Sequence, residues 1–311
     1  MNSVAVILLN FNSTSYTKAC VSSILESHKD CTNLKIIVWD SASEQPPTSS
    51  DFEIGVDLVC SHTNDGFALG NNKACAYAIE KYDPEYLLLL NNDTRLTKGV
   101  IEQLLAVLES DSKVGVVVPK IYFEKNREYH SASYEDEEKG SVIWYGGGTI
   151  DWRNMILVHD GVDEVDRGQL GTDLMTTDFA TGCCMMVKSR VWQELKGFDP
   201  AYFLYYEDAD LSERMKARGY KCQFLPSAYI YHINAGSSSG SGSALHGYYQ
   251  TRSRLRYGLK FAPWRTKIAL LNETRRLWRT GSQAVQLGIL HGLGGIWGNQ
   301  NQRIEKFRHS Q

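Results

Sequence analysis

The stretch that decides the fold is Val4-Ala-Val-Ile-Leu-Leu-Asn-Phe-Asn12, a continuous apolar run that ends on two asparagines. Such a run is typical of a strand that is buried on both faces, as the strands of a parallel sheet are. The turn signal Asn12-Ser13 follows it, and the next residues predict a helix over 15–27. The chain therefore opens with a strand–helix unit.

The same alternation of strand and helix continues to about residue 120. Each further apolar run has the length of a strand, and segments with helical periodicity lie between the runs. We predict strands at 35–39, 56–60, 86–90 and 114–118, and helices at 69–81 and 97–110. This alternation indicates an α/β fold with a mainly parallel central sheet and helices on both faces.

The second part of the chain is less regular. We expect a polar surface loop at 124–139 and a hairpin at 150–158. Residues 236–243 are all Gly or Ser, a composition typical of a mobile linker. The remaining predicted elements are strands at 184–187, 223–225 and 229–231 and helices at 190–195 and 208–218.

The composition is that of an ordinary globular protein of 311 residues, with 42% hydrophobic and 22% charged residues. It excludes a disordered chain, a collagen and a disulfide-stapled small domain. No window holds the ~20 uncharged apolar residues of a membrane-spanning helix. The seven cysteines are odd in number and form no Cys-x-x-Cys motif, so we expect reduced thiols and a cytoplasmic location.

Charge is divided unevenly along the chain. Residues 252–311 hold 12 Lys and Arg against two Glu, a net charge of +10, whereas residues 1–251 hold 21 basic and 34 acidic residues, a net charge of −13. An acidic body with a basic tail indicates an anionic partner at the C-terminal end.

Polar side chains close three of the predicted strands at their carboxyl ends. They are Asn10 with Asn12, then Asp40, then Asn92 with Asp93. Ligands of open parallel sheets bind in the crevice beyond these ends. Any one of these residues alone is most simply a turn former, but three strands that deliver polar groups to one edge favour a binding site.

Two segments near this edge suit a nucleotide and a cation. In Asn64-Asp-Gly-Phe-Ala-Leu-Gly-Asn-Asn72, Gly66 permits close backbone approach, and N–H groups at the following helix start suit a phosphate or a ribose. Asp93 follows a buried strand and two amides, which suits a divalent cation that bridges a diphosphate. The alternatives are an ordinary loop and an Asx turn.

The densest acidic cluster is Glu207-Asp208-Ala-Asp210, which follows the aromatic run 202–206. Acids in the first turn of a helix complement its dipole. The aromatic run before the cluster also suits a carboxylate with a raised pKa that acts as a general base.

His232 is either a packed residue or a metal or phosphate ligand. Arg252 and Arg254 belong either to a solvated basic helix or to a segment that closes over a diphosphate.

Taken in chain order, these motifs resemble the family 2 glycosyltransferases, and most of all their rhamnosyltransferase-type branch in bacterial surface polysaccharide assembly. The motifs are Val-Ile-Leu-Leu-Asn-Phe-Asn at 6–12, Asp-Ser-Ala-Ser at 40–43, the 64–72 loop, Leu-Leu-Asn-Asn-Asp-Thr at 89–94, Thr-Gly-Cys-Cys-Met-Met at 181–186, and Gly-Phe-Asp at 197–199 with Glu-Asp-x-Asp at 207–210. The resemblance implies a GT-A fold, Rossmann-like, over 1–257, with a nucleotide-binding half at 1–120 and an acceptor-side half at 121–257. A basic helical tail at 258–311 would follow.

The resemblance also implies a donor site. Asn10, Asn12 and Asp40 would hold the nucleobase and the ribose of a nucleoside-diphosphate sugar, dTDP- or UDP-linked, with Gly66 and Asn71 in the adjoining loop. Asn92 and Asp93 stand where the family has its Asp-x-Asp motif, so Asp93 would bind Mg²⁺ or Mn²⁺, and His232 would complete the metal or diphosphate site. Arg252 and Arg254 would belong to the same nucleotide site. The first acid of the motif is Asn91 here, which reduces the number of carboxylates available to the metal.

On the acceptor side, the resemblance implies an inverting transfer to a hydroxyl of a saccharide or a lipid-linked acceptor. Asp208 would act as the general base, and Glu207 would orient it or the acceptor. The expected donor is dTDP-rhamnose, from which L-rhamnose is transferred, and a UDP-sugar is the alternative. A nucleotidyltransferase would want a Gly-rich basic loop after the first strand, which is lacking here; a non-catalytic sugar- or nucleotide-binding protein stays open.

The tail combines basic residues with Trp264, Trp278 and Trp297. Basic charge and tryptophan on an amphipathic helix are typical of a helix that lies in a membrane interface. We therefore expect a peripheral contact with the inner face of the cytoplasmic membrane. Helices that pack back on the body and a homodimer contact are the alternatives, and we expect no nucleic-acid partner.

Overall fold

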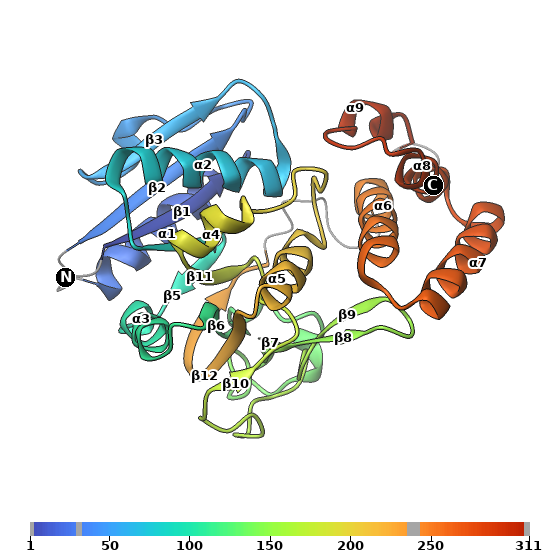
Figure 1. The fold of residues 1–311 in the computed structure, drawn as a ribbon. Helices are drawn as coiled ribbons and strands as arrows, with labels where there is room; N and C mark the ends of the chain where they lie inside the picture. Colours follow the sequence, from blue (N-terminus) through green and yellow to red (C-terminus); the bar gives the residue numbers. More distant parts are fainter. Residues whose placement is uncertain (1–2, 29–32, 235–242, 308–311) are drawn as a thin grey trace.

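Parallel strands form one half of the central sheet. In the computed structural model, which describes residues 3–28, 33–234 and 243–307, β1 (Val4–Asn10) lies between β2 (Leu34–Ser41) and β4 (Tyr86–Asn91), and β3 (Val56–Ser61) adds to β2, all in parallel register. The helices α1 (Thr14–Ser27), α2 (Gly66–Tyr82) and α3 (Val100–Ser110) connect this half (Figure 1). The predicted strand–helix alternation is confirmed.

The other half of the sheet is mixed. β11 (Cys184–Lys188) runs antiparallel between β4 and β6 (Val114–Phe123), and β12 (Lys221–His232) lies parallel to β6. The strands β1, β4, β6 and β11 consist almost wholly of buried residues, so the core extends across both faces of the sheet. The helices α4 (Ser189–Leu195) and α5 (Glu207–Ala217) complete this half.

Several elements differ from the sequence prediction. The two strands expected at 223–225 and 229–231 are the single strand β12, whose register on β6 shifts between Leu225 and Tyr229. Pro226, which has no N–H to donate, lies at this irregularity. The short strands β5 (Thr94–Leu96), β7 (Ile143–Tyr145) and β10 (Met175–Thr176) carried no recognisable pattern, whereas the expected hairpin is present as β8 (Gly148–Asp151) and β9 (Ile156–His159). The predicted linker at 236–243 lies, except for Ser243, outside the described residues.

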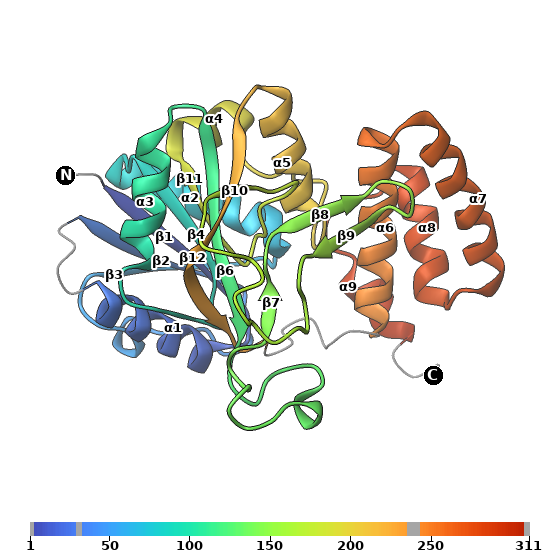
Figure 2. The same cartoon turned by 90° about the horizontal axis from the view of Figure 1, so that it is seen from below.

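The C-terminal helices form a separate layer beside the sheet (Figure 2). They are α6 (Ala244–Phe261), α7 (Trp264–Thr280), α8 (Gln283–Gly294) and the short α9 (Asn301–Ile304). The boundary predicted at residue 257 falls within α6. The helix α8 packs on α6, and Gly288 permits this, since a Cβ there would lie 2.7 Å from the Tyr248 carbonyl oxygen. None of the helices in the described ranges is long and apolar enough to cross a membrane.

A close contact between α2 and the segment before α5 joins the two halves of the molecule. Gly66 has φ +72°, and a Cβ there would lie 2.5 Å from the Phe203 carbonyl oxygen. The next residue, Phe67, donates its N–H to that same carbonyl at 2.8 Å. Only glycine fits at this position, because both the backbone angle and the space exclude a side chain.

Gly66→Ala is expected to lower the free energy of unfolding by about 2–4 kcal/mol, since it combines left-handed strain with overpacking against Phe203. Gly55→Ala is the matched control, because Gly55 also has positive φ, +102°, but nothing lies within 4 Å of its Cβ position. The control should lose about 1 kcal/mol from strain alone. Urea unfolding of both variants measures the difference, and equal losses would contradict the packing account.

Candidate active site

A cavity of about 530 Å³ lies beyond the carboxyl ends of β1 and β4. Its far wall is the start of α5 with the preceding loop, and α6 and α9 contribute to its rim. Among the predicted site residues, the cavity brings together Gly66, Asn92, Asp93, Glu207, Asp208 and His232. Segments more than a hundred residues apart in the sequence therefore share one site, as the motif order requires.

Asp93 and His232 form a pair on the strand side of the cavity. The antiparallel pairing of β5 with β12 sets Thr94 opposite His232, and the N–H of Ile233 donates to the Asp93 carbonyl at 2.8 Å. As a result, Asp93 Oδ1 and His232 Nε2 lie 3.1 Å apart, with both side chains buried. Two neighbouring ligands about 2.1 Å from one octahedral ion would be about 3.0 Å apart.

The donor set fits a divalent cation that takes its other ligands from phosphate and water. His232 Nδ1 is buried and has no hydrogen-bond partner within the described chain, so the ring is held mainly by its packing against Trp144 and by Asp93. Over the same ranges, no three His, Cys, Asp or Glu side chains converge as a complete metal cage. A cation that keeps few protein ligands in the presence of phosphates is the behaviour of Mg²⁺.

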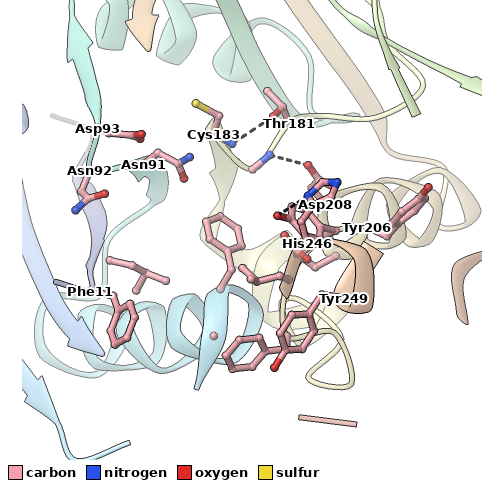
Figure 3. Close-up of a pocket in the computed structure, with 18 of the residues that line it drawn as sticks. Phe11, Asn91, Asn92, Asp93, Thr181, Cys183, Tyr206, Asp208, His246 and Tyr249 are labelled. Atoms are coloured by element: carbon pink, nitrogen blue, oxygen red, sulfur yellow. Dashed lines mark hydrogen bonds between the residues drawn. The ribbon is translucent and has the colours of Figure 1, made fainter. Parts of the chain in front are cut away.

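Asp208 lies on the opposite side of the cavity (Figure 3). Tyr205 and Tyr206 both have φ +69°, and this left-handed turn brings the chain into the first turn of α5 at the cavity wall. Asp208 Oδ2 accepts the Gly182 N–H at 3.0 Å, and Oδ1 accepts the Ala209 N–H at 2.8 Å. Burial raises the pKa of Asp208, and these two N–H donors oppose that shift because they favour the carboxylate.

Glu207 stands beside Asp208 in a drier environment. It is buried, and its Oε2 has no hydrogen-bond partner in the described residues. Burial, and after it the charge of Asp208, raises the pKa of Glu207 well above its ordinary value. Since two neighbouring carboxylates do not both ionise readily, Glu207 is the member of the pair that gives up its proton less readily.

The segment Thr181–Cys183 lies between the two acidic walls (Figure 3). Burial raises the pKa of Cys183 well above its ordinary value, and the charges of both Asp93 and Asp208 add to that shift. Both carboxylates therefore lie within electrostatic reach of one thiol, with the cavity between them. A ligand in this space would meet Asp93 on one side and Asp208 on the other.

Asn10, Asn12 and Asp40, which were predicted to hold the nucleotide, do not line the cavity themselves. Asp40 is fully buried and accepts hydrogen bonds from Asn10 Nδ2 at 2.7 Å and from the N–H and hydroxyl of Ser43. Asn12, at φ +51°, accepts the Glu44 N–H at 2.8 Å. These bonds fix the two loops that place Phe11, Ser13 and Ser41 at the cavity.

Asn71 and the two predicted arginines are also engaged elsewhere. Asn71 donates to the Phe67 carbonyl within α2. Arg252 is fully buried, donates to the Gly298 carbonyl at 2.9 Å and lies over the Tyr249 ring. Arg254 donates to the Met155 carbonyl at 3.0 Å and pairs with Glu273. Neither arginine lines the cavity, and Nε and Nη2 of Arg252 are buried without a hydrogen-bond partner in the described residues. Their contact with the nucleotide stays a prediction.

Sequence reasoning missed the aromatic floor of the cavity. Trp144 packs edge-on against His159 and His232, each with ring centroids 4.6 Å apart. His159 Nδ1 lies 3.1 Å from the Trp144 carbonyl oxygen, which can only accept, so this nitrogen carries the hydrogen. Burial lowers the pKa of His159 to about 4, so the ring is neutral at physiological pH. Isolated aromatic residues in irregular sequence gave no signal for this arrangement.

The six cysteines in the described residues are all free, in agreement with the expected reduced thiols. Residues 2–258 match the family model described as "Glycosyltransferase like family 2". The chain belongs to glycosyltransferase family 2. The resemblance stated from the motifs is therefore confirmed, and it covers the sheet and most of α6.

The chain is similar to several proteins of known name, and their names describe glycosyltransferases. It is 36% identical to the N-acetylglucosaminyl-diphospho-decaprenol L-rhamnosyltransferase of Mycobacterium tuberculosis, over 61% of this chain and 62% of that protein. It is 24% identical to rhamnosyltransferase WbbL of Escherichia coli K12, over 74% of this chain and 83% of that protein. Haloferax volcanii Agl10, a low-salt glycan biosynthesis hexosyltransferase, is 22% identical over 70% of this chain and 62% of its own length.

Two solved structures show the same fold. One is GalNAc-T7 with UDP, GalNAc and Mn²⁺, with a TM-score of 0.63, 15% identity, and coverage of 93% of this chain and 54% of that one. The other is the mannosyltransferase PcManGT of Pyrobaculum calidifontis with GDP-Man and Mn²⁺, with a TM-score of 0.53, 14% identity, and coverage of 97% and 78%. The family 2 chain thus has the GT-A fold, with additional C-terminal helices.

Glu207→Gln is expected to stabilise the protein against urea at pH 8 and to leave its stability close to that of the wild type at pH 5. The raised pKa of Glu207 favours the folded state while the group is protonated, and this contribution is lost as pH rises toward the folded-state pKa. Glutamine has the size and shape of a protonated glutamic acid but cannot ionise. The variant therefore keeps this contribution to stability as the pH rises. The exposed Glu80→Gln is the control, and an equal response in both variants would contradict a protonated Glu207.

Proposed function

We propose that the chain is an inverting glycosyltransferase that moves a sugar from a nucleoside-diphosphate donor to an acceptor hydroxyl. The observation that carries this proposal is the placement of Asp93 with His232 on one wall of a single cavity and of Asp208 on the opposite wall. A transfer with inversion needs these two elements: a site for the departing diphosphate, and a base on the face from which the acceptor attacks.

The donor side is Asp93, His232 and the loops around Phe11, Ser41 and Gly66. Asp93 and His232 would hold Mg²⁺ or Mn²⁺, and a bound cation would offset the negative charge that develops on the leaving diphosphate. Phe11 is 37% exposed and lines the cavity, so its ring offers a face for a nucleobase. Asn10, Asn12 and Asp40 act here as positioning residues, because their bonds hold these loops rather than face the cavity.

The acceptor side is Asp208 with Glu207. The ionised Asp208 takes the proton of the acceptor hydroxyl while that oxygen forms its bond to the anomeric carbon and the bond from this carbon to the diphosphate oxygen breaks. The Gly182 N–H fixes one carboxylate oxygen in place. Glu207 keeps its own proton, so it positions the base without competing for the one from the hydroxyl.

The proposed donor is dTDP-rhamnose, and the proposed setting is cell-surface polysaccharide assembly on a saccharide or lipid-linked acceptor. The relatives named rhamnosyltransferase support this sugar, and the relative whose name carries a diphospho-decaprenol supports a lipid-linked acceptor. A UDP-sugar is the alternative donor, favoured by the UDP-bound structure with the higher TM-score.

The experiment that tests the proposal is slow hydrolysis of the donor in the absence of acceptor. Purified protein with Mn²⁺ or Mg²⁺ is incubated with dTDP-rhamnose, UDP-sugars and GDP-sugars, and the released nucleoside diphosphate is measured. Release from dTDP-rhamnose is the expected result. Release from none of the donors, together with measurable donor binding, would favour a non-catalytic binding protein.

Asp208→Asn is expected to lower the rate of transfer by about 10²–10⁴-fold and to change donor affinity by no more than a few-fold, because a base acts only in the transition state. Asp93→Asn is expected to weaken metal-dependent donor binding itself. Two measurements separate these effects. Initial rates report transfer, and a titration with a non-hydrolysable donor analogue in the presence and absence of Mn²⁺ reports donor affinity.

The matched control for both variants is Asp173→Asn, since Asp173 is exposed and lies outside the cavity. It should change neither donor binding nor rate. Equal loss of binding and of turnover in Asp208→Asn would assign Asp208 to the metal site and would contradict its role as the base.

A further inference from the structure

One side of α7 carries a stripe of large apolar side chains in solvent. Trp264, Ile268, Leu271 and Trp278 are spaced by four, three and seven residues, which places them on one face of the helix. Trp264 is 67% exposed and Ile268 is 52% exposed. Large apolar groups gathered on one face in this way mark a contact surface rather than ordinary surface variation.

The helix is nevertheless anchored to the body through a different side. Leu270 and Thr274 are buried, and a Cβ on Gly258 of α6 would meet Leu270 at 2.5 Å, so the two helices are in close contact. Both overall views place α7 at the end of the molecule farthest from the sheet (Figures 1 and 2). The stripe is thus a fixed outer surface of a folded layer.

The neighbouring helix α8 also carries exposed apolar side chains. Gln286 of α8 donates to the Trp278 carbonyl at 3.1 Å, which sets the start of α8 beside the end of α7. Leu290, Leu293 and Ile296 follow along and after α8, and each is more than 40% exposed. We call these seven apolar residues, which lie on α7, on α8 and just after α8, together with the basic side chains of α7, the outer tail face.

Basic side chains surround the stripe. The helix α7 carries the five cations Arg265, Lys267, Arg275, Arg276 and Arg279. In the described chain no carboxylate pairs with any of them, whereas the single acid of the helix, Glu273, is bound by Arg254. The helix therefore presents five positive charges that no carboxylate of the described residues neutralises, next to exposed tryptophan.

We propose that the outer tail face docks on the surface of a lipid bilayer that contains anionic lipids. Tryptophan and aliphatic side chains would enter the boundary between headgroups and acyl chains, while arginine and lysine would contact the anionic headgroups. The acidic body, with net charge −13 over residues 1–251, would be repelled from the same surface. This charge division would hold the protein with its tail against the membrane.

Charge also decides between a membrane and a second copy of the chain. A two-fold contact through this face would bring each subunit's cations toward those of its partner, and Arg275 lies on the stripe itself, between Leu271 and Trp278. Like charges in a desolvated contact oppose association. An anionic bilayer complements both the apolar and the basic part of the face. The membrane contact itself is independent of the proposed function. Its purpose, access to a lipid-linked acceptor, rests on the proposed function.

The experiment is cosedimentation of the full chain with vesicles of phosphatidylcholine alone and of phosphatidylcholine mixed with phosphatidylglycerol. The wild type should sediment with the anionic vesicles and stay largely in the supernatant with the neutral ones. Arg275→Gln with Arg279→Gln should lower the partition coefficient on the order of 20-fold, from the loss of two cations near the bilayer. Trp264→Ser with Ile268→Ser should lower it by at least about tenfold through lost apolar burial.

Matched controls replace exposed residues of the same kinds elsewhere. Ile54→Ser removes a fully exposed apolar side chain from the body, and Lys98→Gln with Lys125→Gln removes two exposed cations; none of these should change partition. Equal binding of the wild type to both vesicle types, or equal effects of tail and control variants, would overturn the proposal. So would a dimer in sedimentation equilibrium that the tail variants dissociate. Donor hydrolysis without vesicles should be unchanged in all variants, which separates a failure here from a failure of the proposed function.

Discussion

A buried hydrogen-bond network at the carboxyl ends of β1, β2 and β4 holds one wall of the cavity in place. Asn10 donates to Asp40 and accepts a hydrogen bond from the hydroxyl of Thr17, while Asn92 donates to the hydroxyls of Thr17 and Ser13, each at 2.7 Å. Each of these groups would cost about 1–3 kcal/mol if it were buried without its partner. The network therefore fixes the end of β4. It also fixes the position of Asp93, because Asp93 follows Asn92 directly.

The opposite wall is held by sterics and by backbone geometry. Gly66 admits Phe203 at a distance that no side chain would allow, and the two left-handed residues Tyr205 and Tyr206 then lead into α5. Such strained conformations persist only where the surrounding packing enforces them. Asp208 is consequently placed on a rigid element and held by the Gly182 N–H. A site whose two walls are fixed before a ligand arrives is preorganised for charge that develops during transfer.

Much of the fold could be predicted because the buried strands are continuous apolar runs that end on polar residues. The placement of Asp93, Asp208 and His232 around one cavity followed from the order of the motifs. What the sequence did not disclose is whether a polar residue faces the ligand or supports its neighbours: Asp40 is wholly buried, and its role is visible only through its partners. The same limit applies to Arg252: its guanidinium is enclosed by helix packing, and its contact with a phosphate stays a prediction.

Other features depend on contacts that are distant in sequence. Trp144 and His159 lie in the short strands β7 and β9, and the pairing of β7 with β6 and of β8 with β9 brings them to the cavity. The strand β12 continues past Pro226 because its pairing with β6 resumes beyond the irregularity. The tail predicted at 258–311 as basic and helical contains α7 and α8, which are separated at Gly281 and carry the outer tail face. In each case tertiary pairing overrides the local pattern.

The central claim is that Asp93 with His232 and Asp208 perform separate tasks on opposite walls of one cavity. An anomalous difference map from crystals grown with Mn²⁺ and an intact nucleotide sugar tests it most directly. We expect a single manganese peak within bonding distance of both Asp93 and His232, with the anomeric carbon of the sugar directed toward Asp208. A metal peak bonded to Asp208, or a sugar whose anomeric carbon is turned away from Asp208, would contradict the account.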